Sequence, residues 1–207
     1  AGSLDGRTAM ANGESKWITG EAARADVQQW RARAGAILTG AATVLADDPL
    51  LTARPEAGEF LPPLRVVLDA RLRTLECRRV REGDAATLYL HDPSVPPPAL
   101  EDAEFAGVGV QDDGRLDLAG VMAMLAARGI NEVHVEAGPT LCGALLKAGL
   151  VDELLLYMAP LLMGDGARPL LAGLGIEHMA QALSLELHDA RMLGKDLRLQ
   201  LRPTTNN

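Results

Sequence analysis

Short apolar runs alternate with segments of helical periodicity along the first three quarters of this chain, and this alternation constrains the fold most strongly. Runs rich in Val, Leu and Ile predict strands at residues 36–40, 64–69, 87–91, 132–136 and 153–159. Apolar residues spaced three and four apart predict helices at residues 21–34, 116–128 and 140–148. Such alternation is typical of an α/β protein with a mostly parallel sheet flanked by helices.

The last part of the chain predicts a different arrangement. Residues 183–188 and 196–201 predict two strands separated by a turn at Gly194. We expect them to form an antiparallel pair at the edge of the otherwise parallel sheet. Weaker patterns predict a strand at 108–110 and one helical turn at 43–46. The 207 residues suffice for one α/β domain or for two small ones.

Charge and composition exclude several classes of partner. The formal net charge of −8 argues against general affinity for nucleic acid or an anionic membrane, because both require a dense basic face. A local basic pocket for a phosphorylated small molecule remains compatible with this negative net charge. Two cysteines, Cys77 and Cys142, are too few for a disulfide framework, so a reduced, cytoplasmic location is expected. No apolar run approaches the ~20 residues of a membrane span.

The strongest local signal is the stretch VHVEAGPTLCGALL at residues 133–146. A predicted strand ends at Glu136, small residues turn the chain, and a helix begins near Pro139. Free backbone N–H groups and the positive end of the helix dipole make such a junction a site for anions. Gly138 and Gly143 would let a diphosphate approach the backbone. The alternative is a plain strand–helix connection without a ligand, and the stretch is not the GxGxxG fingerprint.

Glu136 stands where a ligand crevice is expected, because the carboxyl ends of parallel strands line such crevices. A carboxylate there can equally cap a helix or form a structural salt bridge. His134 and Glu136 also spell the H-x-E of zinc deaminases, but the pair of cysteines that completes that metal shell is missing. His134 is therefore interpreted as a packed strand residue, and no metal site is predicted.

Two arginines, Arg31 and Arg54, are candidates for a phosphate site. With Ser15 they could clamp a phosphate, because guanidinium groups match its oxygens, or they could be ordinary surface residues. Trp17 could flank a nucleotide ring or simply pack. Arg71, just after the strand-terminal Asp69, could meet the 2′-phosphate that distinguishes NADP from NAD, or remain surface charge.

Several segments, taken together and in order, resemble the reductase domain of the bifunctional riboflavin-biosynthesis deaminase–reductase. The matching stretches are SLDGRTAMA at 3–11, GESKWITG at 13–20, AILTGAATVLADDPLLTAR at 36–54, RVVLD at 65–69, VEAGPTLCGALL at 135–146 and GLVDELLLYMAP at 149–160. The resemblance covers most of the chain. It implies that residues 1–207 form a single dihydrofolate-reductase-like reductase domain that is truncated at its N-terminus.

The resemblance also implies an activity and a set of site residues. The chain would use NADPH to reduce 5-amino-6-(5-phosphoribosylamino)uracil, whose open-chain imine accepts hydride at C1′. The residues implied to contact the substrate are Ser15, Arg31, Leu51, Arg54 and Glu136. Those implied to contact NADPH are Ala1, Trp17, Thr43, Asp47, Ala70, Arg71, Gly138, Pro139, Thr140, Leu141, Cys142, Gly143 and Ala144. No side chain is an obvious proton donor, and Glu136 and Asp47 are the catalytic candidates.

The chain departs from the family pattern in three ways. Ala70 stands where the family often has Ser, which leaves Arg71 as the candidate for the 2′-phosphate. A lysine that usually precedes the SLDG segment would fall before Ala1. The deaminase half is absent, and we expect it upstream in the full-length protein.

Two other functions remain open, and one expectation concerns assembly. A reductase of the same fold could act on a pteridine such as dihydrofolate, or the chain could be a non-catalytic nucleotide-binding module. The apolar residues at 154–156 and the Leu-rich stretch at 161–174 predict a homo-oligomer, most simply a homodimer.

Overall fold

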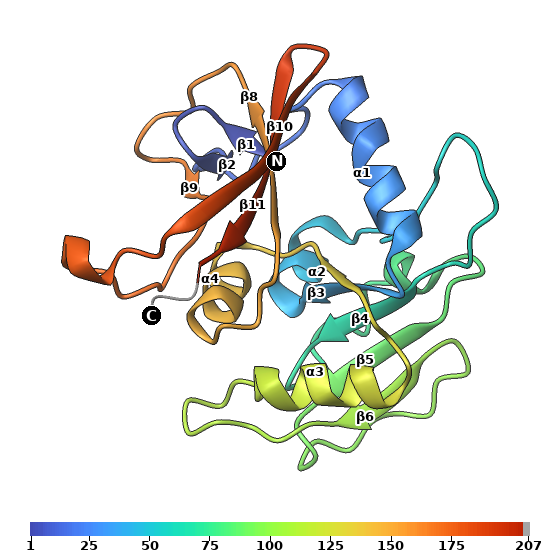
Figure 1. The fold of residues 1–207 in the computed structure, drawn as a ribbon. Coiled ribbons are helices and arrows are strands. Elements are labelled where there is room, and N and C mark those ends of the chain that lie inside the picture. The colour runs from blue at the N-terminus through green and yellow to red at the C-terminus, as the bar shows by residue number, and fades with distance from the viewer. Residues whose placement is uncertain (205–207) are drawn as a thin grey trace. The chain divides into compact units, whose positions relative to one another are not determined.

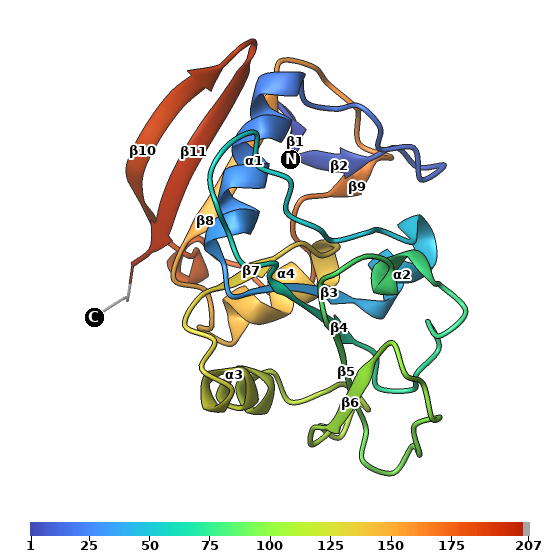
Figure 2. The ribbon, with the colours of Figure 1, turned by 90° about the vertical axis from the view of Figure 1, so that its right-hand side faces the viewer.

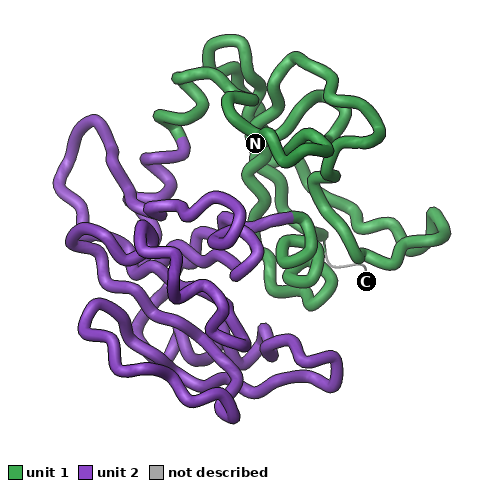
Figure 3. The backbone as a smooth tube through the Cα atoms, turned by 180° about the vertical axis from the view of Figure 1, so that it is seen from behind, with its two compact units in different colours: residues 1–26, 139–207 green, residues 27–138 purple. Residues whose placement is uncertain are grey.

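The computed structural model describes residues 1–204. Contacts between residues divide the chain into two compact units (Figure 3). Unit 1 contains residues 1–26 and the chain from Pro139 onward, and unit 2 contains residues 27–138. Helix α1 (Glu21–Arg33) begins in unit 1 and ends in unit 2.

Unit 2 contains a five-stranded, fully parallel sheet (Figures 1 and 2). Its strand order is β6-β5-β4-β3-β7. The strands are β3 (Ala36–Gly40), β4 (Leu64–Leu68), β5 (Thr87–His91), β6 (Glu104–Gly107) and β7 (Val133–Val135). The register aligns Leu38 with Val66 on one side and with Val135 on the other. The parallel sheet that the alternating pattern predicts is confirmed.

Helices of unit 2 follow from local sequence signals. Helix α2 (Ala41–Asp47) is longer than the single turn predicted at 43–46, and its Val44 is buried with Ile37 and Val67. Helix α3 (Leu118–Ala127) begins after Asp117, whose Oδ1 accepts the N–H of Ala119 at 3.1 Å. Such a cap satisfies an N–H group that the helix itself leaves unpaired.

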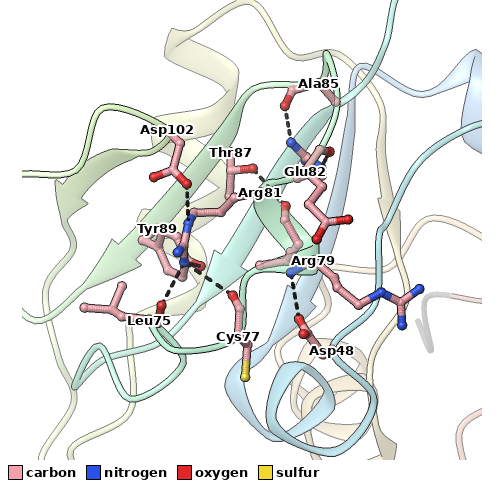
Figure 4. Close-up of polar contacts among 12 residues, drawn as sticks. Asp48, Leu75, Cys77, Arg79, Arg81, Glu82, Ala85, Thr87, Tyr89 and Asp102 are labelled. Atoms are coloured by element: carbon pink, nitrogen blue, oxygen red, sulfur yellow. Dashed lines mark hydrogen bonds and ion pairs between the residues drawn. The ribbon is translucent and has the colours of Figure 1, made fainter.

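The connection from β4 to β5 contains a single turn of 3-10 helix, η1 (Arg79–Arg81), and is organised by buried arginines. Arg81 donates to the carbonyl oxygens of Leu75 and Cys77 at 3.0 and 3.3 Å, and it pairs with Asp102 at 2.9 Å (Figure 4). Arg65 is fully buried and donates to the carbonyl of Glu82 at 2.6 Å. These donors satisfy backbone carbonyl groups in a connection that has little regular secondary structure.

Unit 1 contains a four-stranded sheet of order β1-β8-β11-β10. Its strands are β1 (Gly2–Ser3), β8 (Leu154–Ala159), β10 (Leu185–Leu193) and β11 (Asp196–Pro203). Strands β2 (Arg7–Ala9) and β9 (Arg168–Pro169) form a small antiparallel pair. Helix α4 (Pro139–Lys147) and the 3-10 turn η2 (Met179–Gln181) complete the unit. The predicted antiparallel pair of β10 and β11 is confirmed. Its expected place at the edge of the parallel sheet is wrong, because β11 pairs with β8 and the pair belongs to this separate sheet.

The two faces of the β8–β11–β10 sheet differ in chemistry, because side chains alternate along each strand. On one face Arg198 is buried and pairs with Asp189 at 2.5 Å and with Asp26 of α1 at 3.1 Å. The Tyr157 hydroxyl donates to the same Asp26 carboxylate at 2.6 Å. The register places apolar residues together on the other face, namely Leu154, Leu156, Met158, Leu185, Leu187, Met192, Leu197, Leu199 and Leu201.

Some predicted boundaries are wrong. The strand predicted at 108–110 lies instead at Glu104–Gly107, where Phe105 pairs with Tyr89 and stacks on its ring at 5.4 Å between centroids. Val110 forms only an isolated β-bridge with Leu116. Helix α3 therefore begins at Leu118 and not at residue 116, where the sequence predicted it. None of the helices within residues 1–204 has the length and apolar character that crossing a membrane requires. The assignment of residues 1–207 to one domain stays a prediction.

Candidate functional site

The centre of the candidate site in unit 2 is an ion pair between Arg31 and Glu136. The Nε and Nη2 atoms of Arg31 each donate to one carboxylate oxygen of Glu136 at 2.5 Å. Arg31 lies in the last turn of α1, and Glu136 follows the end of β7. The Glu136 N–H donates to Leu38 O at 2.9 Å, so the backbone still pairs with β3 there. Helix and sheet therefore fix both partners.

The surroundings of Glu136 keep it ionised. Burial alone would raise its pKa, but hydrogen bonds and charges from Arg31 and His134 outweigh burial and lower the pKa to about 2. His134 Nε2 lies 3.2 Å from a Glu136 oxygen, so this strand residue contacts the site. The side chains of Arg31 and Glu136 are 15% and 25% exposed, which leaves an accessible edge of the pair. A carboxylate held in this state accepts hydrogen bonds and is unsuited to donate a proton at neutral pH.

Residues 51–54 lie against the same face of α1 as Arg31. Arg31 Nη1 donates to Thr52 O at 3.0 Å, and the Arg54 N–H donates to Gln28 Oε1 at 2.8 Å. Leu51 is 3% exposed with φ of 46°, a conformation that costs a residue with a Cβ about 1 kcal/mol or more. The Arg54 side chain is exposed. Of the two predicted phosphate-binding arginines, Arg31 is thus engaged by Glu136, whereas Arg54 reaches solvent.

Two glycines near the start of α4 have different roles in the structure. A Cβ placed on Gly138 would meet only Thr43 Oγ1, at 3.9 Å, so the space beside its backbone is open. A Cβ on Gly143 would lie 1.9 Å from Ala172 O, and Ala172 N–H donates to Pro139 O at 3.1 Å. The interpretation of Gly143 as a gap for diphosphate needs correction, because the backbone at Ala172 fills that space.

The first turn of α4 retains the features of an anion site. Pro139 begins the helix, Thr140 is exposed, and the first N–H groups of a helix have no partner within it. The remaining predicted cofactor residues there, Leu141, Cys142 and Ala144, are half-buried.

Elsewhere in unit 2, the other predicted cofactor residues follow the ends of parallel strands. Thr43 and Asp47 lie on α2, which begins directly after β3. Ala70 and Arg71 follow β4 in a turn organised by buried Asp69, whose Oδ2 accepts the N–H and hydroxyl of Thr74 at 2.8 Å. Arg71 is exposed, and the pKa of Asp92 is lowered mainly by hydrogen bonds from Ser94, with a smaller contribution from the charge of Arg71. This turn therefore presents a cation to solvent.

In unit 1 the predicted site residues are Ala1, Ser15 and Trp17. Trp17 is 73% exposed, and the guanidinium of Arg24 lies 4.6 Å from the centre of its ring. A flat aromatic surface this exposed is available for stacking. Ala1 is exposed and Ser15 is half-buried.

Gln28, which fixes the backbone of Arg54, was missed by sequence reasoning. A glutamine on a helix carries no signal of its own, because its bond partner lies 26 residues away. Among residues 1–204, no three His, Cys, Asp or Glu side chains are grouped so that they could hold a metal ion.

Riboflavin biosynthesis protein RibD of Escherichia coli K12 is 42% identical over 210 residues, covering 96% of this chain and 57% of that protein. The solved structure of Acinetobacter baumannii RibD has a TM-score of 0.85 at 38% identity, covering 98% of this chain and 56% of that one.

A further solved structure is similar over the same part of the chain. It is the Thermotoga maritima diaminohydroxyphosphoribosylaminopyrimidine deaminase/5-amino-6-(5-phosphoribosylamino)uracil reductase, with a TM-score of 0.81 at 26% identity, covering 98% of this chain and 54% of that one. The chain thus spans little more than half the length of these relatives, and the similarity confirms the α/β fold expected from the resemblance. The RibD C-terminal domain family matches residues 1–199, and the chain belongs to this family.

Proposed function

We propose that this chain is the reductase of riboflavin biosynthesis that converts 5-amino-6-(5-phosphoribosylamino)uracil to its ribitylamino product with NADPH. Membership of the RibD C-terminal domain family over residues 1–199 is the observation that carries the proposal. The name of the Thermotoga maritima relative includes this reductase activity. The chemistry of unit 2 supports it, because an ionised carboxylate and an exposed arginine suit a polar, phosphorylated substrate.

We assign the sugar phosphate first to Arg54. Its guanidinium is exposed and rests on a backbone fixed by α1, so it can bind phosphate oxygens without breaking another ion pair. Arg31 has two of its five donors on Glu136 and one on Thr52 O, and its remaining donors could still contribute. Ser15 of unit 1 is proposed to add a hydroxyl, and Leu51 to give an apolar contact.

Glu136 is proposed to orient the substrate. As an anion it can accept hydrogen bonds from N–H or hydroxyl groups of the aminouracil or the opened sugar. Reduction of the C1′ imine adds hydride to carbon and a proton to nitrogen. The low pKa of Glu136 makes it a poor source of that proton. Of the two catalytic candidates, Asp47 and Glu136, neither is assigned as the acid, and solvent is the simplest donor.

The residues present fit NADPH, which when bound would supply the hydride. The open space beside Gly138 in unit 2 suits the close approach of a diphosphate. In unit 1, the positive end of the α4 dipole favours the same anion. In unit 2 we assign Thr43, Asp47, Ala70 and Gly138 to the cofactor, and Arg71 to its 2′-phosphate. In unit 1 the assigned residues are Ala1, Trp17, Pro139, Thr140, Leu141, Cys142, Gly143 and Ala144. Gly143 and Ala144 are assigned as part of helix α4, whose dipole favours the diphosphate, because the space beside Gly143 is filled by Ala172 O.

The proposal extends to assembly. The apolar face of β8, β10 and β11 includes Leu185, Leu187 and Met192, which are 41%, 56% and 62% exposed. Because contiguous apolar patches of this kind commonly mark interfaces, we propose that a second copy covers this face in a homodimer. A cytoplasmic location and fusion to an upstream deaminase domain complete the proposal.

One experiment tests the activity and separates it from the alternatives. The purified protein is mixed with the deaminated phosphoribosylamino-pyrimidine, and NADPH absorbance is followed beside an NADH control. NADPH oxidation that depends on this compound and exceeds that with NADH is expected. Oxidation with dihydrofolate instead would indicate a pteridine reductase, and NADPH binding without turnover of either compound would indicate a non-catalytic module.

A further inference from the structure

We infer that Gln28 is a positioning residue that fixes Arg54 for the sugar phosphate, an inference that rests on the proposed function. Gln28 lies three residues before Arg31 on α1, so the two side chains project from the same helical face. Gln28 Oε1 accepts the Arg54 N–H at 2.8 Å, and Arg31 Nη1 donates to Thr52 O at 3.0 Å. One helix face thus holds residues 52–54 through both a donor and an acceptor.

The segment itself shows why these bonds matter. Leu51 and Ala53 are buried, whereas Thr52 is half-buried and Arg54 is exposed, so the side chains alternate inward and outward. Leu51 adopts a positive φ of 46°, which a residue with a Cβ adopts only when its neighbours fix it. The bond from Arg54 to Gln28 secures the end of the segment that carries the exposed guanidinium.

The chemistry of a glutamine suits this position. Its amide oxygen accepts the backbone N–H without bringing a negative charge beside a phosphate dianion. Fixing the backbone before the substrate arrives lowers the entropy lost when the guanidinium grips the phosphate. The role is therefore in substrate affinity, and the hydride step itself should not depend on it.

Gln28→Met tests this role, because it keeps the length of the side chain and removes the acceptor. Gln29→Met on the exposed neighbour is the matched control. We expect Gln28→Met to raise KM for the phosphorylated substrate about three- to tenfold, the loss of one hydrogen bond, while kcat stays within about twofold. Ribose 5-phosphate binding by calorimetry should weaken by a similar factor, binding of unphosphorylated ribose should not change, and Gln29→Met should match wild type.

A double-mutant cycle separates positioning from general destabilisation. If Gln28 acts through Arg54, adding Gln28→Met to Arg54→Ala should not raise KM further. Hydrogen exchange measured by NMR should show a protected Arg54 amide in the wild-type protein and loss of that protection in Gln28→Met. The wild-type measurement tests the bond even if the variant folds poorly.

The outcomes distinguish two failures. Wild-type protein that does not turn over the phosphorylated substrate contradicts the proposed function. Wild-type turnover with an unprotected Arg54 amide, an unchanged KM in Gln28→Met, or additive effects in the cycle would overturn the role of Gln28 and leave the function standing.

Discussion

Arg31 and Glu136 bind each other through two parallel hydrogen bonds of 2.5 Å, so that each neutralises the other within unit 2. This pairing changes the view of the phosphate site that the sequence suggests. The sequence and the resemblance assign both Arg31 and Arg54 to the phosphate, whereas in the structure Arg31 is engaged by Glu136 and Arg54 is exposed. The engaged arginine organises the carboxylate and, through Thr52 O, the segment that leads to Arg54.

The first prediction concerns the stability of this pair as pH changes. The pKa of Glu136 falls from its usual 4.5 to about 2, so the stabilisation is complete above pH 4.5 and is lost as pH falls through 2. Glu136→Gln should lower the free energy of unfolding by on the order of 1–3 kcal/mol at pH 7, because Arg31 loses a charged partner. Urea unfolding at several pH values should show this difference shrinking below pH 4.5. A difference that grows as pH falls would contradict it.

Arg54→Ala should affect the substrate and not the cofactor. Removing the exposed guanidinium should raise KM for the phosphorylated substrate about tenfold or more, since charge-assisted bonds to phosphate contribute about 1.5–3 kcal/mol. KM for NADPH should stay near the wild-type value. Arg33→Ala is the control, because Arg33 pairs with Glu132 at the surface and such pairs contribute little. Equal effects of the two substitutions on KM would remove Arg54 from the phosphate site.

Two glycine substitutions should separate packing from cofactor binding. Gly143→Ala places a Cβ 1.9 Å from Ala172 O, so we expect a loss of about 2–4 kcal/mol in unfolding free energy despite the better helix propensity of alanine. Gly138→Ala has open space and should leave stability nearly unchanged while raising KM for NADPH. Thermal unfolding and NADPH titration measure the two effects. A stable Gly143→Ala protein would contradict the packing role.

Assembly depends on the apolar face of the unit 1 sheet. Leu185→Glu with Leu187→Glu places two charges on that face and should convert a dimer to monomers in analytical ultracentrifugation. Glu186→Gln, which alternates to the other face, is the control and should leave the mass unchanged. A monomeric wild-type protein at micromolar concentration would contradict the homodimer.

Much of the fold is predictable from the sequence, because the apolar pattern within each short segment is enough to identify a buried strand. Strands β3, β4 and β5 are mostly apolar and buried along their length, as expected for parallel strands covered on both faces, and their predicted bounds agree closely with the structure. Strand β6 was misplaced because Phe105, rather than the Val108–Val110 run, provides the contact with Tyr89. That choice depends on a partner strand and is invisible in a local window.

In the candidate site, too, the residues could be identified from the sequence, whereas their contacts with distant parts of the chain could not. Sequence reasoning and the family resemblance singled out Arg31, Arg54 and Glu136, but not which of the arginines Glu136 would engage. That pairing depends on how α1 lies relative to β7, which brings residues 105 positions apart into contact. The roles of Gln28 and of buried Arg65 arise in the same way, from bonds to backbone groups that no motif records.

Transfer of label from NADPH tests the central claim most directly. The protein is incubated with the deaminated phosphoribosylamino-pyrimidine and NADPH carrying deuterium at C4 of the nicotinamide, each stereoisomer in turn, and the product is examined by mass spectrometry and NMR. Direct reduction predicts one deuterium at C1′ of the ribitylamino product from one stereoisomer and none from the other. Product without label from either stereoisomer, or no product from folded protein that binds both compounds, would contradict it.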